Sequence, residues 1–229
     1  MRTAPSTILL GIDTSTQLIG VALYNGSKVL GEYTWETQDH HTVELAPGIE
    51  TAMQKSGLVI SDLGAVGIAT GPGSFTGLRI GMAFAKGLVM ANKLPLVGVP
   101  TLDGLAFAQG IQRIPIAAAL RAGRGRYAVA WYRRTGLKLK PAEYTRVLTP
   151  EELVSQITSK TLVCGDFSAE ERQILRKNRK LIKLAAPAFC LRRPAFLSEI
   201  AWNRWQKGDT DDPVSLSPLY LHYNQPALV

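Results

Sequence analysis

The sequence predicts an α/β fold built on mixed sheets, and three observations lead to this prediction. Apolar runs of strand length are interspersed with segments of helical periodicity over the first 110 residues. An Asn25-Gly26 pair separates the second apolar run from the third, which is typical of a β-hairpin. After this hairpin, helices and strands alternate, and such an order places helices on the faces of a sheet.

In the first half, each expected element has a local reason. Leu45, Ile49 and Met53 repeat at helical spacing, and Gly57 ends that helix. A loop rich in Gly, Pro, Ser and Thr precedes a second helix, for which Ser74 is a good N-cap. The expected elements are strands over 8–12, 19–24 and 29–37, a helix to residue 55, a strand over 65–70, a helix over 75–91, a strand over 94–99 and a helix over 100–110.

The second half is less regular. Its expected elements are strands over 114–120 and 127–133 around an Arg-rich turn, a further strand after residue 136, a helix over 150–157, a strand over 161–164, and helices over 169–179 and 194–206. We expect the domain boundary near residues 105–113. This gives an N-terminal domain of residues 1–105 and a smaller, basic C-terminal α/β domain of residues 106–229.

The order of elements in the first half is the order found in the ribonuclease-H-like half-domains of actin-like ATPases. In that fold a phosphate-binding turn with a glycine follows the first strand, but here Ser15 stands at the glycine position. The loop before the second helix matches neither a P-loop nor a dinucleotide fingerprint. The sequence therefore predicts a degenerate nucleotide site in which weak anion contact would come from Asp13, Thr14, Ser15, Gly71, Gly73, Ser74 and Thr76.

Charge is distributed unevenly along the chain. Residues 1–110 hold 6 Lys/Arg and 8 Asp/Glu, whereas residues 111–229 hold 20 and 10. A solvated basic surface explains this asymmetry, and so does contact with nucleic acid or an acidic protein. For nucleic acid, the candidate residues are Arg121, Arg124, Arg126, Arg133 and Arg134.

Catalytic and metal-binding patterns are sparse. His40 and Glu44 form one i, i+4 pair without an evident third ligand, so no metal site is expected. The two cysteines have no CxxC spacing, and the N-terminus has no extended apolar segment. We therefore expect a cytoplasmic protein that is neither exported nor anchored in a membrane.

Four stretches resemble a known family: GIDTSTQLIGVALYNG, HHTVELAP, ATGPGSFTGLRIGMAFAKGL with LPLVGVPTL, and the terminal SPLYL. Together they closely resemble the TsaB (YeaZ) family, with the specific match over residues 8–105. This resemblance implies an actin-like fold without catalysis and a heterodimer with TsaD that serves threonylcarbamoyladenosine synthesis in tRNA. It also implies that TsaE joins a larger complex and that the partner subunits use ATP and Mg²⁺, with no cofactor expected on this chain.

The resemblance places the partner-binding helices at residues 41–55 and 75–91. The residues expected to bind TsaD are Leu45, Ile49, Met53, Leu78, Arg79, Met82, Ala83 and Lys86. TsaD-type enzymes hold a metal with an H-x-x-x-H motif, but Glu44 stands where the second histidine would be. Family members often carry an acidic hairpin in the second half, where this chain has Arg121 and Arg126.

The leading hypothesis is a non-catalytic scaffold subunit that binds TsaD. One alternative is a residual nucleotide-binding phosphotransferase that uses Asp13, Thr14 and the 71–76 loop. A second alternative is a basic module that contacts tRNA directly through the Arg-rich hairpin. Self-association of the isolated chain through the same helices is a further alternative.

Overall fold

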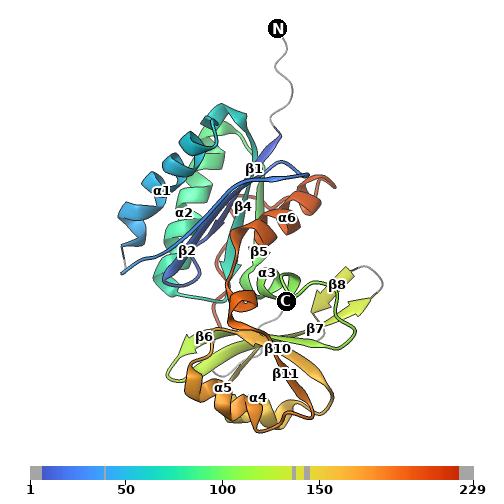
Figure 1. Cartoon of the computed structure of the whole chain (residues 1–229). Coiled ribbons are helices and arrows are strands. Elements are labelled where there is room, and N and C mark those ends of the chain that lie inside the picture. The colour runs from blue at the N-terminus through green and yellow to red at the C-terminus, as the bar shows by residue number, and fades with distance from the viewer. Residues whose placement is uncertain (1–6, 39, 136–137, 142–144, 222–229) are drawn as a thin grey trace. The chain divides into compact units, whose positions relative to one another are not determined.

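A computed structural model describes residues 7–38, 40–135, 138–141 and 145–221. The chain divides into two compact units (Figure 1). The first unit combines Met1–Gly104 with Arg193–Leu219, and the second combines Leu105–Arg192 with Tyr220–Val229. The first break thus falls at the expected boundary, whereas residues 193–219, which were expected in the C-terminal domain, belong to the first unit.

A five-stranded mixed sheet forms the centre of the first unit, with strand order β3-β2-β1-β4-β5. Its strands are β1 (Ile8–Asp13), β2 (Leu18–Tyr24), β3 (Val29–Glu36), β4 (Leu63–Gly71) and β5 (Leu96–Pro100). The first three pair antiparallel, and β4 and β5 continue parallel to β1. The Asn25-Gly26 turn joins β2 to β3 as predicted, and Gly26 has a φ of +85°.

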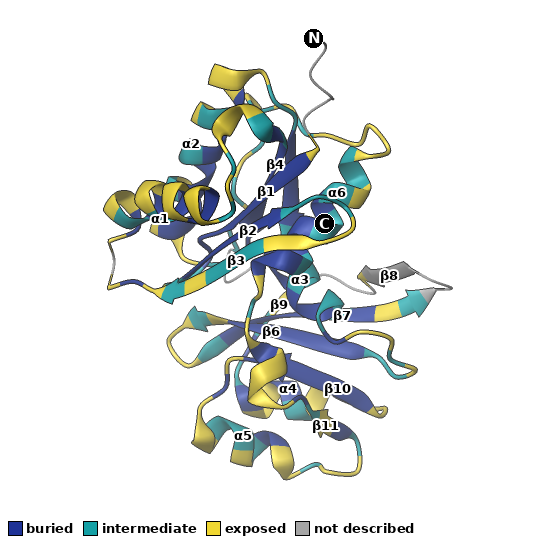
Figure 2. Cartoon of the chain, turned by 45° about the horizontal axis from the view of Figure 1, so that its top comes forward, coloured by how far each residue is buried: buried dark blue, intermediate teal, exposed yellow. Residues whose placement is uncertain are grey.

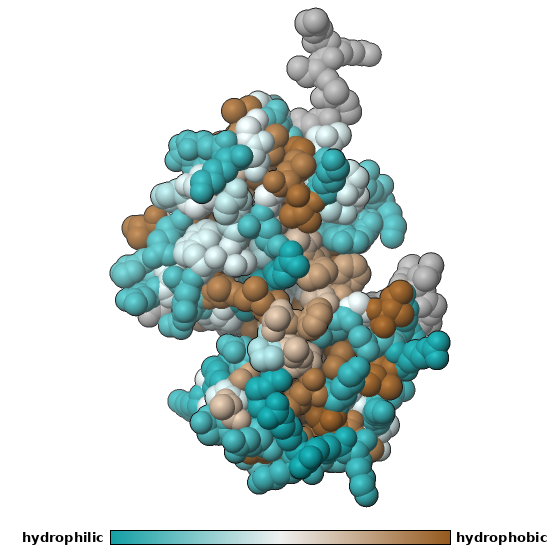
Figure 3. Space-filling model, viewed as in Figure 1, coloured by the Kyte–Doolittle hydropathy of each residue, from teal (hydrophilic) through white to brown (hydrophobic). Residues whose placement is uncertain are grey.

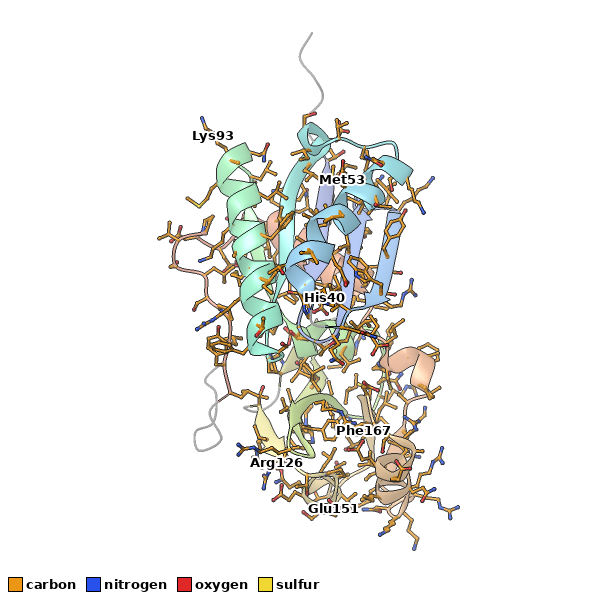
Figure 4. The ribbon with its side chains drawn as sticks, turned by 90° about the vertical axis from the view of Figure 1, so that its left-hand side faces the viewer. His40, Met53, Lys93, Arg126, Glu151 and Phe167 are labelled. Carbon is orange, nitrogen blue, oxygen red and sulfur yellow. The ribbon has the colours of Figure 1, made fainter. Side chains whose placement is uncertain are left out.

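Two helices cover one face of this sheet: α1 (His41–Lys55) and α2 (Phe75–Asn92). Figure 4 shows them side by side, with His40 and Met53 marking the start and the last turns of α1 and Lys93 the end of α2. Leu45 and Ile49 from α1 and Met82 from α2 lie in one core cluster with apolar side chains of the sheet. Ser74 caps α2 as predicted, because its Oγ accepts a hydrogen bond from the Gly77 amide.

The other face of the sheet is covered by α6 (Pro194–Trp205), which comes from the far end of the chain. Leu197 and Ala201 of α6 pack in a core cluster with Leu9 and Val97 of the sheet. Glycines in the sheet let α6 approach closely, since a Cβ at Gly67 would lie 2.7 Å from the Ala201 Cβ. The apolar sheet face needs this cover, and for that reason residues 193–219 belong with the first unit.

After α6, the chain returns along the edge of β5. The Asp211 amide donates to the Leu96 carbonyl, and the Asp211 carboxylate accepts from the Gly98 amide at 2.7 Å. Further on, the Leu219 amide donates to the Thr70 carbonyl at 2.7 Å. The two Asp211 bonds satisfy backbone groups of β5 that would otherwise be unpaired at the sheet edge, and the Leu219 bond pairs a carbonyl near the end of the inner strand β4.

The second unit contains a six-stranded sheet with the order β11-β10-β6-β7-β8, and β9 also pairs with β7. Its strands are β6 (Ile116–Gly123), β7 (Arg126–Thr135), β8 (Lys138–Pro141), β9 (Arg146–Leu148), β10 (Thr161–Gly165) and β11 (Ile182–Leu184). Two helices, α4 (Pro150–Gln156) and α5 (Ala169–Arg176), contact one another, and their apolar residues lie in a core cluster with residues of the sheet. Figure 2 shows this unit with buried strands beneath helices whose outer surfaces are exposed.

Most of the predicted elements are present. The helix expected over 100–110 is the shorter α3 (Thr101–Phe107), and the one expected over 169–179 ends at Arg176. Sequence analysis missed the short strands β9 and β11 and the 3-10 turns Ile60–Asp62 and Pro187–Cys190. Within the described ranges, no helix has both the length and the apolar character needed to cross a membrane.

Candidate functional site

The predicted anion site lies where the loop after β1 meets the N-terminus of α2. The Ser74 amide, which begins the helix, donates to the Ser15 carbonyl at 2.6 Å. A Cβ at Gly73 would overlap this same carbonyl, so the loop after β1 and the loop before α2 are in direct backbone contact. One of the backbone donors at the start of α2, the Ser74 amide, is therefore already used by the chain itself.

Glycines on α2 bring the helix against the same loop. A Cβ at Gly77 would overlap the Thr14 carbonyl oxygen, and one at Gly81 would overlap the Thr14 hydroxyl. Thr14 is fully buried, and its hydroxyl has no hydrogen-bond partner among the described residues. The hydroxyl faces the backbone of α2 at this contact and not a cavity.

Thr101 completes this arrangement from a third direction. Its hydroxyl lies 2.8 Å from the Ser15 hydroxyl and accepts from the Gly71 amide at 3.2 Å. The Asp13 carboxylate accepts from the Ser15 amide at 2.8 Å. Six of the seven predicted anion contacts, all except the exposed Thr76, are thus brought together. Within this group Ser15 bonds to Asp13 and Ser74, whereas Gly71 bonds to Thr101.

The two histidines among the described residues, His40 and His41, do not belong to a metal-binding group. The His41 ring nitrogen Nε2 lies 2.9 Å from the Thr16 carbonyl, which ties α1 to the loop after β1. His40 is exposed, and its Nδ1 lies 3.9 Å from the Glu44 carboxylate. Among the described residues, no group of three or more His, Cys, Asp or Glu side chains could hold a metal ion.

The residues predicted to bind a partner require a correction. Leu45, Ile49, Met53, Leu78 and Met82 are at most 5% exposed, and most of them fill the core between the helices and their own sheet. These five residues lie on the apolar side of their helices, and in an amphipathic helix that side packs inward. Only Arg79 and Ala83 of the predicted set are exposed, and Lys86 is partly so.

The exposed side of the two helices carries a different set of residues, which we call the α1–α2 outer face. It consists of Val43, Ala46 and Pro47 on α1 and Phe75, Arg79, Ala83, Gly87 and Met90 on α2. Val43, Phe75 and Met90 are 66%, 52% and 63% exposed. The Arg79 guanidinium stacks over the Phe75 ring at 3.7 Å. In Figure 3 the surface over α1 is mostly of intermediate hydropathy with isolated apolar residues.

Arg121, predicted to contact nucleic acid, is held in an internal network of the second unit. Its guanidinium lies 2.9 Å from the Glu171 carboxylate, which also accepts from the Tyr127 hydroxyl at 2.5 Å and from the Ser168 amide at 2.7 Å. Burial works to raise the pKa of Glu171, but these hydrogen bonds outweigh burial and lower the pKa. Burial and the bond to Glu171 raise the pKa of Tyr127.

The other arginines of the hairpin do not form one basic surface. Arg126 pairs with Glu152 at 3.5 Å, and Arg124 is exposed at the turn with a φ of +51°. Arg133 and Arg134 are neighbours on β7, so their side chains leave opposite faces of the sheet. Of the five candidate nucleic-acid contacts, Arg121 and Arg126 are thus paired with carboxylates of the chain itself.

Sequence analysis did not identify Thr101 or His41 as site residues. Both act through hydrogen bonds to residues far away in sequence, namely Ser15 and Thr16. The glycines of α2 could have indicated this contact from the sequence. A glycine inside a helix lowers helix stability, and close packing against another segment is one reason for its presence. In this structure, Gly77 and Gly81 have that explanation.

The mixed sheets, the helices on their faces and the filled turn after β1 define an actin-like ATPase fold with a degenerate nucleotide site. The family model described as "TsaD: tRNA N6-adenosine threonylcarbamoyltransferase" matches residues 28–193. The tRNA threonylcarbamoyladenosine biosynthesis protein TsaB of Escherichia coli is 30% identical, over 94% of this chain and 95% of that protein. This chain belongs to the TsaB family.

Two solved structures support the fold. YeaZ from Pseudomonas aeruginosa superposes with a TM-score of 0.75 at 24% identity, covering 94% of this chain and 100% of that one. The component A of (R)-2-hydroxyglutaryl-CoA dehydratase from Acidaminococcus fermentans superposes with a TM-score of 0.52 at 10% identity, covering 87% and 99%. At these identities the similarity shows a shared fold.

Proposed function

We propose that this chain is a non-catalytic subunit of the machinery that makes threonylcarbamoyladenosine in tRNA, and that it binds a TsaD protein through the α1–α2 outer face. The family relationship supports the pathway, because curated relatives are named for this biosynthesis. The matching family model describes TsaD, so the chain itself resembles the partner that we propose for it. Since the substrate of that machinery is tRNA, we expect the chain to act in the cytoplasm.

The observation that carries this proposal is the composition of the outer face. Ala83 and Gly87 leave room on α2, and a Cβ at Gly87 would meet no atom within 4 Å. Small residues at such positions let the backbone of a partner helix approach to the 8–10 Å that helix packing requires. Exposed Val43, Phe75 and Met90 supply apolar surface around this gap.

The filled turn after β1 supports a non-catalytic role. A nucleotide phosphate needs free backbone amides, but here the Ser15 carbonyl occupies the Ser74 amide. We therefore propose that ATP and Mg²⁺ act on the partner subunits, including a TsaE protein in a larger complex. In the absence of TsaD, we propose that the α1–α2 outer face of one copy pairs with that of a second copy.

Co-purification with TsaD of the same organism tests the interface. Ala83→Glu places a charge on the outer face without entering the core, and we expect it to abolish co-purification. Gly87→Leu is expected to do the same by steric block, since this position is open in the isolated chain. The matched control is Asn203→Glu, at an exposed position of α6 on the opposite face of the sheet. Full retention of TsaD by both outer-face variants would disprove the assignment.

A further inference from the structure

A second surface is set apart by its charge. Residues 172–183, RQILRKNRKLIK, contain six Arg or Lys residues and no Asp or Glu. They cover the end of α5, the turn after it and β11. Arg176, Lys177, Arg179 and Lys180 are exposed, and we call these four residues the α5 basic surface.

The backbone holds these four residues in a fixed arrangement. Leu175 is fully buried and anchors the end of α5. In the turn that follows, the Asn178 carbonyl accepts from the Leu181 amide at 3.2 Å and from the Ile182 amide at 2.8 Å. Gln173, Arg176, Lys177 and Arg179 line a shallow depression of about 610 Å³. The surface over α5 is hydrophilic in Figure 3.

The α5 basic surface differs from the arginines of the neighbouring hairpin in its charge balance. Arg121 and Arg126 are each paired with a carboxylate. No salt bridge between described residues involves any of the four cations of the α5 basic surface. Their charge is therefore available to an external anion.

The helix dipole of α5 explains the presence of only some of the cations in the α5 basic surface. Arg176 is in the last turn of α5, where a cation complements the helix dipole. Arg179 and Lys180 lie beyond the helix, and the dipole effect declines within the last turn. Lys160 is a further exposed cation close to this surface. The residue after it, Thr161, donates its amide to the Leu181 carbonyl, and Leu181 directly follows Lys180.

We propose that the α5 basic surface binds the phosphate backbone of tRNA. The choice of tRNA as the ligand rests on the proposed function. The choice of phosphate contacts rests on the residues of the α5 basic surface. Residues 169–184 contain no aromatic side chain on which a base could stack. Exposed cations around a shallow depression, without an aromatic platform, are suited to phosphate contacts, which position RNA without reading its sequence.

The test compares two charge reversals of equal size in the full-length chain with TsaD bound. The first variant carries Arg176→Glu, Lys177→Glu and Arg179→Glu. The control carries Arg124→Glu, Arg133→Glu and Lys183→Glu, which lie in the same unit but outside the surface. Lys183 is a close match, because Ile182 and Leu184 pack toward α5 and the alternation of β11 turns Lys183 to the other face.

The probe is an unmodified tRNA transcript, and its Kd is measured over a range of salt concentrations. At about 0.1 M salt, we expect the first variant to bind tRNA about tenfold or more weakly. The slope of log K against log salt should fall by about 2 to 3, which corresponds to the loss of two or three phosphate contacts. The control should lose less than about threefold in affinity, since its charges are not at the contact.

An unchanged Kd and salt slope in the first variant would overturn the proposal, and so would an equal loss in both variants. If the true ligand is an acidic protein, tRNA binding will be unchanged while binding of a polyglutamate probe falls, and this result also overturns the proposal. Co-purification of each variant with TsaD is scored separately. Loss of tRNA affinity with TsaD retained supports the α5 basic surface, whereas loss of TsaD by Ala83→Glu concerns only the proposed interface.

Discussion

The Ser74 amide donates a 2.6 Å hydrogen bond to the Ser15 carbonyl, so the start of α2 is bound by the loop that follows β1. Both groups belong to the backbone, and hence the contact depends on how closely the loops approach and not on the side chain of Ser15. Gly73, Gly77 and Gly81 allow that approach.

Replacing Gly77 by Ala should destabilise the protein. The new Cβ would overlap the Thr14 carbonyl oxygen, which belongs to the backbone and cannot rotate away. We expect the free energy of unfolding to fall by roughly 1–3 kcal/mol. Gly87→Ala in the same helix is the matched control, because its Cβ meets nothing within 4 Å and should raise stability by up to about 1 kcal/mol. Urea unfolding of both variants measures the difference, and equal stability of the two would contradict this packing.

Ser15→Gly should not create a nucleotide site. Glycine restores the residue type expected in a phosphate-binding turn, but the carbonyl of residue 15 still occupies the Ser74 amide. Titration calorimetry with Mg-ATP should show no saturable binding at about millimolar nucleotide for either the variant or the parent chain. Loss of the hydrogen bond between the Ser15 and Thr101 hydroxyls should cost roughly 1 kcal/mol of stability. Saturable binding by the variant would show that the side chain, and not the carbonyl, closes the site.

Glu171→Gln should lower stability in a pH-dependent way. The folded pKa of Glu171 is lowered, so its stabilisation is complete above the unfolded pKa of about 4.3 and is lost as the pH falls through the folded value. At neutral pH we expect the variant to lose roughly 1–3 kcal/mol, because Tyr127, Ser168 and Arg121 lose a charged acceptor. The difference from the parent should shrink below about pH 4.

The control for this measurement is Glu151→Gln, at an exposed position in the first turn of α4, which should change stability by less than about 0.5 kcal/mol. Figure 4 labels Glu151 together with Phe167 and Arg126 of the same unit. Thermal unfolding at several pH values gives the comparison. A constant difference between Glu171→Gln and the parent across the acid range would disprove the role of the ionised carboxylate.

A fragment of residues 1–104 should not fold alone. It lacks α6, and the sheet face formed by Leu9, Val97 and their neighbours would be open to water. A fusion of residues 1–104 to 193–219 through a short Gly-Ser linker should fold, since Gly104 lies next to α6: a Cβ placed on Gly104 would be 3.9 Å from the Leu197 amide nitrogen. Circular dichroism and urea unfolding distinguish the two fragments. Cooperative unfolding of the shorter one would show that α6 is dispensable.

Local sequence patterns predicted most elements because the causes are local. The Asn25-Gly26 turn, the Ser74 cap and the apolar period of α1 each act within a few residues. The site was harder to predict because its causes are distant. Arg121 pairs with Glu171 fifty positions later, and no pattern near Arg121 indicates that its charge is neutralised.

The partner surface shows a different limit of sequence analysis. Sequence periodicity identifies the apolar side of a helix. When the helix packs on a sheet of the same chain, that apolar side is buried in the core and is not available to a partner. Met82 is therefore buried, whereas the neighbouring Ala83 is exposed. A docking face on such a helix consists of small and mixed residues, and their pattern is hard to distinguish from ordinary surface.

The position of α6 has a consequence for synthesis on the ribosome. The second unit is continuous from Leu105 to Arg192 in its main part, whereas the first unit needs residues from both ends of the chain. When the first 104 residues emerge, the helix that covers one face of their sheet has not been made. The sheet of the unit that begins the chain must therefore wait for α6, whereas the second unit already has its own strands and helices by Arg192.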